Sequence, residues 1–354
     1  MSLLFEPMTL RETQFANRAW VAPMCQYSAD GGLVGDWHLA HLGSLATGGF
    51  GLVVAEATAV VAEGRISPRD AGLWHESHVE AWRRITSFVH ERGTLLGVQL
   101  AHAGRKASTY WPWHERSGTV PFEDGGWGTR GPSAVPFPGY VPPAEVTPED
   151  IAALPELFAA AARRALAAGF DVVEVHAAHG YLLHEFLSPL SNVRTDEYGG
   201  SLENRMRLPL EVTRAVREAW PEERALLVRI SATDWVTGGL TVDESVELAK
   251  ELAVAGADLV DVSTGGNVLA DIPVGPGYQV PAARAVREGA GVPVSAVGLI
   301  TDPLQAEQVL VDQAADAVML GRAALREPRW ALRAAHELGD ARGTWQPQYE
   351  RARL

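Results

Sequence analysis

The sequence predicts an α/β protein folded as a single (β/α)8 TIM barrel. Short apolar runs rich in β-branched residues alternate with amphipathic helical stretches, the pattern of a parallel sheet with helical crossovers. Eight such runs can be counted, which is the number of strands that closes a TIM barrel. The length of 354 residues would also allow two average domains, but barrels of this class often exceed about 250 residues as one unit.

The expected strands are spaced so that a helix fits between most neighbours. They cover residues 18–24, 50–60, 94–100, 171–176, 225–231, 259–263, 292–297 and 316–320. Capping residues mark several of the helices between them. Thr147 and Pro148 precede an alanine-rich helix expected over 154–168, Thr241 opens one over 241–252, and Thr301-Asp302-Pro303 opens another.

Three segments depart from this alternation. Residues 105–147 are rich in Gly, Pro and Trp and show no period. They follow the third strand on the face where barrel active sites lie, so we expect a subdomain that caps the site. Residues 3–10 are expected to form a short hairpin that closes the barrel floor. The polar tail over 344–354 shows no pattern.

Composition excludes several classes of function. The net charge of −14 disfavours binding to nucleic acid or to an anionic membrane surface. No run of about 18 apolar residues predicts a membrane-spanning helix, and the N-terminus lacks the pattern of a signal peptide. Cys25 is the single cysteine, so no intrachain disulfide can form. A cytoplasmic protein is expected.

The strongest chemical motif lies at the end of the fourth strand, in VVEVHAAHGYLLHEFLSPLSN over 172–192. It projects His176, His179 and Tyr181 at the strand's carboxyl end, where ligands bind in barrels. Two neutral imidazoles that donate to one oxygen would polarise a carbonyl, and the phenol could protonate a nearby carbon. The alternative is that the histidines are core residues bonded to backbone. No third ligand with metal-site spacing follows, so no metal is expected.

Glycines and an arginine follow the last two strands. Gly298 ends the seventh strand, and Gly321 and Arg322 follow the eighth. Glycines here let backbone N–H groups approach a phosphate, and a guanidinium would neutralise it. A phosphorylated cofactor or substrate is therefore expected, although the glycines could simply turn the chain.

Three further side chains could contact a ring-shaped ligand. Arg229 lies in an apolar strand and needs either a carboxylate partner, such as Asp171 or Glu174, or an electron-rich ligand. Gln99 could match a heteroaromatic edge or serve as an ordinary core hydrogen bonder. Cys25 has no assignable general base, which leaves cofactor tuning by its S–H group or an inert buried thiol.

The chain resembles the Old Yellow Enzyme family of FMN-dependent ene-reductases, and within it the thermophilic-like subclass. The resemblance spans nearly the whole chain, and HAAHGYLLHEFLSPLSN followed by DEYGGSLENR is its most specific part. The other matching segments are VAPMCQYS (21–28), EATAV (56–60), GVQLAHAGRKAS (97–108), VRIS (228–231), SAVGLI (295–300) and LGRAAL (320–325).

The resemblance implies a role for each matched residue. FMN would be bound by Ala22, Pro23, Met24, Cys25, Ala57, Gln99, Arg229, Gly298, Gly321 and Arg322. His176 and His179 would hold the substrate carbonyl oxygen, Tyr181 would donate the proton, and Tyr27 would contact the substrate. The family also implies a homodimer or homotetramer in which a C-terminal arginine, Arg351 or else Arg353, enters a neighbour's site.

The implied activity is that of an NADPH dehydrogenase or ene-reductase. NADPH or NADH would reduce FMN, and hydride from flavin N5 would then reduce the C=C bond of an α,β-unsaturated carbonyl or nitro compound. Two other classes remain open: an FMN barrel with a different second substrate, and a flavin-free barrel that binds a phosphosugar. A dienoyl-CoA reductase-like protein is disfavoured, because one cysteine cannot supply an iron–sulfur segment.

Overall fold

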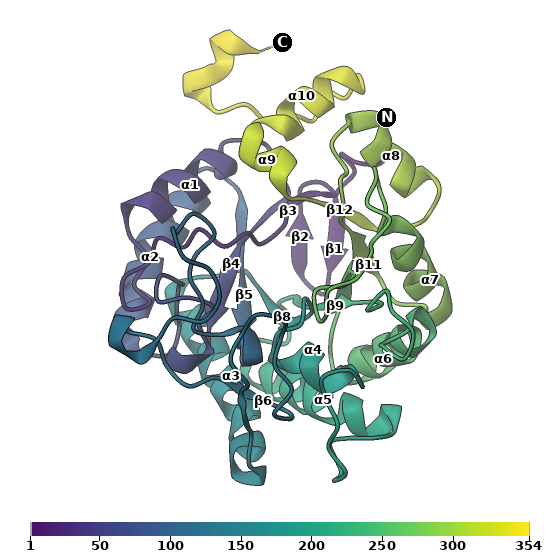
Figure 1. Cartoon of the computed structure of the whole chain (residues 1–354). Helices are drawn as coiled ribbons and strands as arrows, with labels where there is room; N and C mark the ends of the chain where they lie inside the picture. The colour runs from purple at the N-terminus through teal and green to yellow at the C-terminus, as the bar shows by residue number, and fades with distance from the viewer. Residues whose placement is uncertain (1, 354) are drawn as a thin grey trace.

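The computed structural model describes residues 2–353 and contains the predicted closed barrel (Figure 1). Eight parallel strands form it, and helices surround it, which confirms the predicted fold class. In spatial order the strands are β3 (Ala19–Val21), β4 (Leu52–Ala59), β5 (Leu95–Ala101), β8 (Val172–Ala177), β9 (Leu226–Ser231), β10 (Leu259–Ser263), β11 (Val294–Ala296) and β12 (Ala317–Leu320), which pairs with β3.

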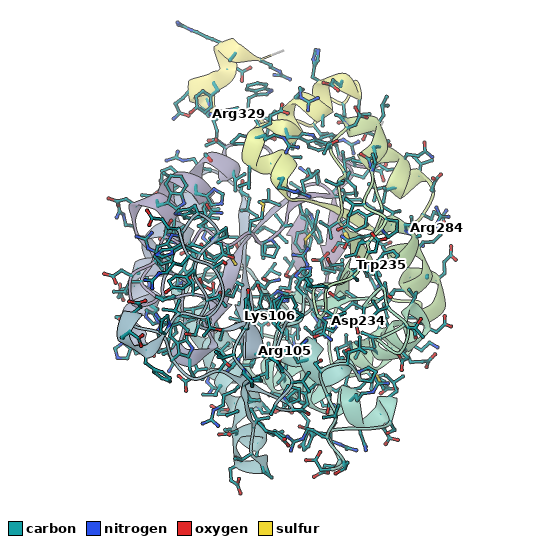
Figure 2. All side chains as sticks on the ribbon, in the orientation of Figure 1. Arg105, Lys106, Asp234, Trp235, Arg284 and Arg329 are labelled. Atoms are coloured by element: carbon teal, nitrogen blue, oxygen red, sulfur yellow. The ribbon has the colours of Figure 1, made fainter. Side chains whose placement is uncertain are left out.

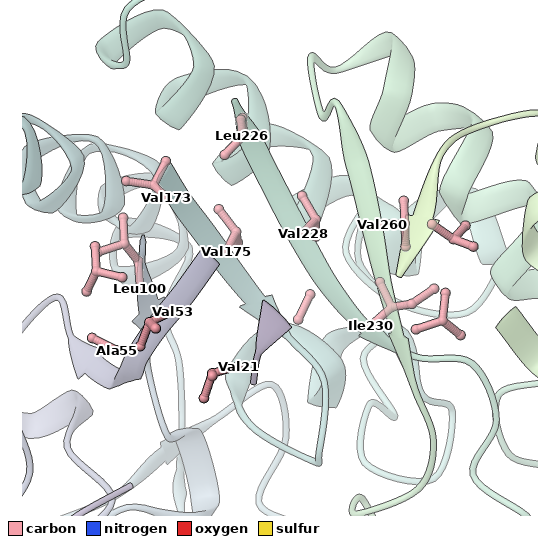
Figure 3. Close-up of a cluster of buried hydrophobic side chains, with 14 of the residues drawn as sticks. Val21, Val53, Ala55, Leu100, Val173, Val175, Leu226, Val228, Ile230 and Val260 are labelled. Carbon is pink, nitrogen blue, oxygen red and sulfur yellow. The ribbon is translucent and has the colours of Figure 1, made fainter. Parts of the chain in front are cut away.

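Side chains along each strand alternate between the helices and the barrel interior. In β8, Val173 and Val175 join the large apolar cluster that packs against the surrounding helices (Figure 3). Glu174 and His176, between and beyond these valines, belong to the opposite face, which points into the barrel. Polar side chains therefore point into the barrel from the middle of the strands and from their carboxyl ends. This arrangement places the site at the carboxyl end of the barrel.

Capping residues begin several helices at the predicted places. Thr147 accepts from the N–H of Asp150 and caps α3, with Pro148 at its first position, and Asp302 caps α8. The helices are α1 (Asp36–Ala46), α2 (Glu76–His90), α3 (Pro148–Ala168), α4 (Leu182–Leu187), α5 (Leu202–Ala219), α6 (Val242–Val254), α7 (Val280–Ala290), α8 (Pro303–Val311), α9 (Arg322–Arg326) and α10 (Trp330–Glu337).

The N-terminal hairpin lies later in the chain than expected. It consists of β1 (Met8–Leu10) and β2 (Thr13–Phe15) rather than residues 3–10. Its buried Leu10 and Phe15 pack with residues from the amino ends of the barrel strands, so the hairpin does close the barrel floor. The first barrel strand is also shorter than predicted, because Pro23 has no N–H to continue the ladder.

The segment 105–147 contains little regular structure. It holds 3-10 turns over Gly104–Lys106 and Phe122–Asp124, and a two-stranded sheet of β6 (Arg130–Gly131) and β7 (Ala144–Glu145). Arg105 donates to the carbonyl of Val135 at 3.1 Å, which ties the segment to the carboxyl end of β5.

The C-terminal tail forms a 3-10 helix over Pro347–Ala352, at the top of Figure 1 beyond α10. The guanidinium of Arg329 lies 4.3 Å from the ring centre of Tyr349 and holds the tail to the barrel. Arg351 is exposed. Within residues 2–353, no helix combines the length and the apolar character needed to cross a bilayer.

Candidate active site

The two histidines and the tyrosine of the motif meet at the carboxyl end of β8. The rings of His176 and His179 have centroids 5.2 Å apart, and those of His176 and Tyr181 are 5.0 Å apart, both pairs edge to face. Tyr181 and Tyr27 pack against one small apolar cluster that includes Ala57. The structure thus brings together the three residues predicted to do chemistry, with the residue predicted to contact substrate beside them.

The turn that follows β8 is held by side chains from distant parts of the chain. His179 has a left-handed φ of 59°. Its N–H donates to Ser231 Oγ at 2.9 Å, and its carbonyl accepts from Lys106 Nζ at 2.7 Å. Lys106 also donates to the carbonyl of Gly266 at 2.9 Å and lies 5.0 Å from the centre of the Tyr181 ring. In Figure 2, Lys106 lies near the middle of the barrel.

Hydrogen bonds fix which nitrogen of each histidine remains for a ligand. His176 Nδ1 accepts from the N–H of Ala178 at 3.3 Å, so the ring hydrogen is on Nε2. His179 Nε2 lies 2.7 Å from Ser263 Oγ, which leaves Nδ1 for the site. Ser263 Oγ also lies 3.1 Å from Gln279 Oε1, but that oxygen already accepts from the N–H and the hydroxyl of Thr264, both at 2.8 Å. The single hydrogen of Ser263 therefore goes to the shorter contact with His179 Nε2, His179 carries its own hydrogen on Nδ1, and both imidazoles can donate.

Burial sets the protonation of these groups. It lowers the pKa of His176 and of His179 well below the ordinary value, and the charge of Arg229 adds to the effect. Burial also raises the pKa of Tyr181 well above its usual range. Two neutral imidazoles and a protonated phenol therefore face one another at neutral pH.

Cys25 is a protonated thiol at neutral pH. Burial, with the nearby charges of Asp70 and Glu56, raises its pKa well above the ordinary value. This excludes a nucleophilic thiolate. Glu56 of β4 holds the loop that carries Cys25. It accepts from the N–H of Gln26 at 3.0 Å and lies 3.1 Å from His38 Nε2.

Gln99 and Arg229 are each fixed from below by a buried carboxylate. Gln99 Nε2 donates to Glu174 at 2.7 Å, which leaves its carbonyl oxygen for another partner. Arg229 Nε lies 2.9 Å from Asp261, so its carboxylate partner is neither Asp171 nor Glu174. Burial raises the pKa of Glu174 to about 8, and the charge of Asp261 adds to this, so one proton is held in this layer at neutral pH.

A cavity at the ends of β10, β11 and β12 gathers the residues predicted to hold a phosphate. It is lined by Arg229, Gly298, Gly321 and Arg322, with Arg326 beside them. Three guanidiniums and two glycines around one hollow are suited to a phosphate. FMN fits this site: the cradle would hold its phosphate, and Gln99 and Arg229 would face its ring.

The loop after β3 adjoins the same cavity. The N–H of Ala22 donates to the carbonyl of Leu320 at 3.0 Å. A Cβ at Gly321 would lie 3.8 Å from the sulfur of Met24. The loop that carries residues 22–25 therefore lies beside Gly321, at the edge of this cavity.

Sequence reasoning missed several residues that the structure adds to the site. Lys106 belongs to the HAGRK segment after β5, where its place at a strand end was a usable indication. Ser263 and Gln279 line the phosphate cavity, and neither has a local pattern that marks it. Arg351 and Arg353 lie on the tail, and neither lines this cavity. Across residues 2–353, no cluster of three or more His, Cys, Asp or Glu side chains could hold a metal ion.

Comparisons with known proteins agree with this geometry. The model of the NADH:flavin oxidoreductase / NADH oxidase family matches residues 3–341. An NADPH dehydrogenase of Geobacillus sp. (strain WCH70) is 48% identical over 99% of this chain and 98% of its own length. An NADPH dehydrogenase of Listeria innocua is 45% identical over 96% of each chain.

Solved structures give the same result. The old yellow enzyme homologue from Zymomonas mobilis superposes with a TM-score of 0.80 at 28% identity, over 99% of both chains. Morphinone reductase superposes with a TM-score of 0.80 at 28% identity, over 98% of this chain and 92% of its own. The chain therefore belongs to the NADH:flavin oxidoreductase / NADH oxidase family, the Old Yellow Enzyme homologues, and is an FMN-dependent oxidoreductase.

Proposed function

We propose that this enzyme uses NAD(P)H to reduce the C=C bond of small α,β-unsaturated carbonyl or nitro compounds. The observation that supports the proposal best is the meeting of two neutral imidazoles and a protonated phenol beside the cavity suited to FMN. Both known NADPH dehydrogenases named above match almost the full chain, which supports NADPH or NADH as the reductant.

The chain's own residues would hold the cofactor. Gly298, Gly321 and Arg322 bind its phosphate, while Gln99 and Arg229 contact its ring from the barrel side. Residues 22–25 and Ala57 complete the pocket. FMN, when bound, supplies the hydride that the protein itself cannot supply.

His176 and His179 bind the substrate oxygen through Nε2–H and Nδ1–H. Because both rings are neutral, they polarise the carbonyl or nitro group without adding a full charge. Tyr181 then delivers its proton to the carbon next to the polarised group. Its raised pKa makes it a weak acid, which is adequate when the acceptor is a strongly basic carbon.

The remaining parts are assigned by their position. The whole chain acts as one FMN-binding domain, with residues 105–147 covering the site and Tyr27 contacting the substrate. Tyr27 already packs edge to face against Trp113 of this segment, with ring centres 5.7 Å apart. A homodimer or homotetramer, in which Arg351 or Arg353 enters a neighbouring site, fits the exposed position of the tail.

The test is spectroscopic and works whichever alkene is the physiological substrate. The purified protein should be yellow, and anaerobic NADPH should bleach it. Cyclic enones, maleimides and nitroalkenes should then restore the colour. A protein that stays colourless after FMN is added would contradict the proposal.

Two substitutions test the clamp itself. His176→Ala and His179→Ala should each weaken binding of a para-substituted phenol by about tenfold or more while FMN stays bound, since each removes a donor to the ligand oxygen. His336→Ala, on the exposed end of α10, is the matched control and should change nothing. Unaltered phenol binding in both clamp variants would refute this role.

A further inference from the structure

A buried histidine–aspartate pair lies directly behind the turn that carries His179 and Tyr181. His184 sits in α4 and is fully buried. Its Nδ1 accepts from the N–H of Gly180 at 2.8 Å, and its Nε2 lies 3.2 Å from Asp234 Oδ1. Asp234, labelled in Figure 2, follows β9 and is also fully buried. The pair has no place in the chemistry proposed above.

The tautomer of His184 follows from these contacts. A backbone N–H can only donate, so Nδ1 carries no hydrogen and Nε2 must carry it toward Asp234. Burial alone would raise the pKa of Asp234. The 3.2 Å contact with His184 and the hydrogen bonds from Ser188 at 2.6 Å and from the N–H of Leu240 at 2.8 Å outweigh burial and hold that pKa below its ordinary value.

The hydrogen bond to His184 completes the restraint of one peptide unit. The N–H of Gly180 and the carbonyl of His179 belong to the same peptide bond. His184 holds the N–H, and Lys106 holds the carbonyl. Gly180 has a φ of 70°, and a Cβ there would lie 2.3 Å from the carbonyl oxygen of Gly266. The N–H and the carbonyl of this peptide are thus both held by hydrogen bonds, and the carbonyl of Gly266 packs closely against Gly180.

We propose that His184, oriented by Asp234, is a positioning residue for the proposed reaction. It fixes the plane of the 179–180 peptide and therefore the angle between the His179 imidazole and the Tyr181 phenol. The role rests on the proposed function of those two residues. Misplacement by about 1 Å of groups that must act together can reduce a rate by about 100-fold, so control of this plane has consequences for turnover.

Two substitutions separate the hydrogen bond of the imidazole to Gly180 from its contact with Asp234. In His184→Asn the amide oxygen replaces Nδ1 as the acceptor for Gly180, and the contact with Asp234 is lost. In His184→Gln the amide nitrogen replaces Nε2 as the donor to Asp234, and the acceptor for Gly180 is lost. Both variants are studied as FMN-loaded enzyme, with 2-cyclohexen-1-one as substrate and 4-hydroxybenzaldehyde as the phenol probe.

The expected results run in opposite directions for stability and turnover. The Gln variant should keep most of the thermal stability, but its kcat should fall by about tenfold or more and its phenol Kd should rise. The Asn variant should have the lower Tm, because Asp234 loses its buried partner, while its kcat stays within a few-fold of wild type. FMN content should be the same in all three proteins.

If His184 had a purely structural role, the variant with the lower Tm would also have the lower kcat, and this result would overturn the proposal. A Gln variant with wild-type kcat and phenol Kd would also overturn it. If neither variant accumulates as holoenzyme, Asp234→Asn serves as the third variant. It keeps the imidazole but permits the other tautomer of His184, so kcat should again fall and phenol binding should weaken. An Asp234→Asn variant with unchanged kcat and phenol Kd would contradict the proposal. Failure of the wild type to bind the phenol would instead overturn the proposed function, and this role with it.

Discussion

At the scale of single residues, the fold sets protonation states before any ligand arrives. Burial keeps His176 and His179 neutral and Tyr181 protonated. Burial in the barrel also keeps one proton on Glu174 and Asp261, the two carboxyl groups that hold Gln99 and Arg229. In the proposed reaction these three side chains need no proton rearrangement before they bind a carbonyl, and preorganisation of this kind lowers a barrier most.

Tyr181→Phe tests the proton donor alone. The substitution removes one hydroxyl and keeps the ring that packs against His176. Reduction of 2-cyclohexen-1-one should slow by about 10²–10⁴-fold, the usual contribution of a general acid. Reduction of the flavin by NADPH and the Kd for a phenol should change little. Stopped-flow absorbance separates the two half-reactions, and an unaltered second half-reaction would assign the proton to another group.

At the scale of elements, local sequence pattern determined what could be predicted. The βα alternation identified all eight barrel strands, and the motif after β8 named three side chains that the structure does bring together. The hairpin was misplaced, because three-residue strands such as β1 leave almost no periodic pattern. The place of Lys106 at a strand end indicated that it lies near the site, but its contact with the β8 turn was not predictable, and neither was that of Ser231. The two residues are separated from His179 by 73 and 52 positions and meet it only in the folded barrel.

The β8 turn should tolerate no side chain at Gly180. Gly180→Ala places a Cβ 2.3 Å from the carbonyl oxygen of Gly266 and demands a left-handed backbone. We expect a loss of at least about 2 kcal/mol in stability, or a displaced turn with little enone reduction. Gly125→Ala is the matched control: its φ is 87°, nothing lies within 4 Å, and only about 1 kcal/mol of backbone strain is expected. Equal effects on Tm and activity would refute the steric argument.

At the scale of the whole molecule, buried acids and buried histidines give stability opposite dependences on pH. Glu185 is fully buried and accepts from the N–H of Arg105 at 2.8 Å. Burial raises its pKa to about 8, whereas the unfolded chain releases this proton near pH 4.3. Its contribution to stability is therefore complete at low pH and is lost as the pH rises toward 8. Burial lowers the pKa of His102 to about 4, so its contribution is lost as the pH falls below about 6.5.

Glu185→Gln isolates the acidic contribution. Gln can still accept from Arg105 and cannot ionise, so the variant should gain stability relative to wild type as the pH rises from 5 to 8. The relative gain should amount to a few kcal/mol at most, on the order of 1.4 kcal/mol per pKa unit. Thermal unfolding at each pH measures it, with exposed Glu218→Gln as the control. A Tm difference that stays constant across this range would mean that Glu185 does not hold a proton in the fold.

The C-terminal tail does not line the phosphate cavity of its own chain. Arg351 is exposed on a 3-10 helix held to the barrel by Arg329 and Tyr349. If it completes a neighbour's site, Arg351→Ala and Tyr181→Phe should each be nearly inactive alone. Mixed oligomers should recover activity, because one site then combines an intact Tyr181 with an intact Arg351. Arg353→Ala, mixed in the same way, decides which arginine acts. Absence of recovery after subunit exchange, verified by mass, would assign the tail no role in a neighbouring site.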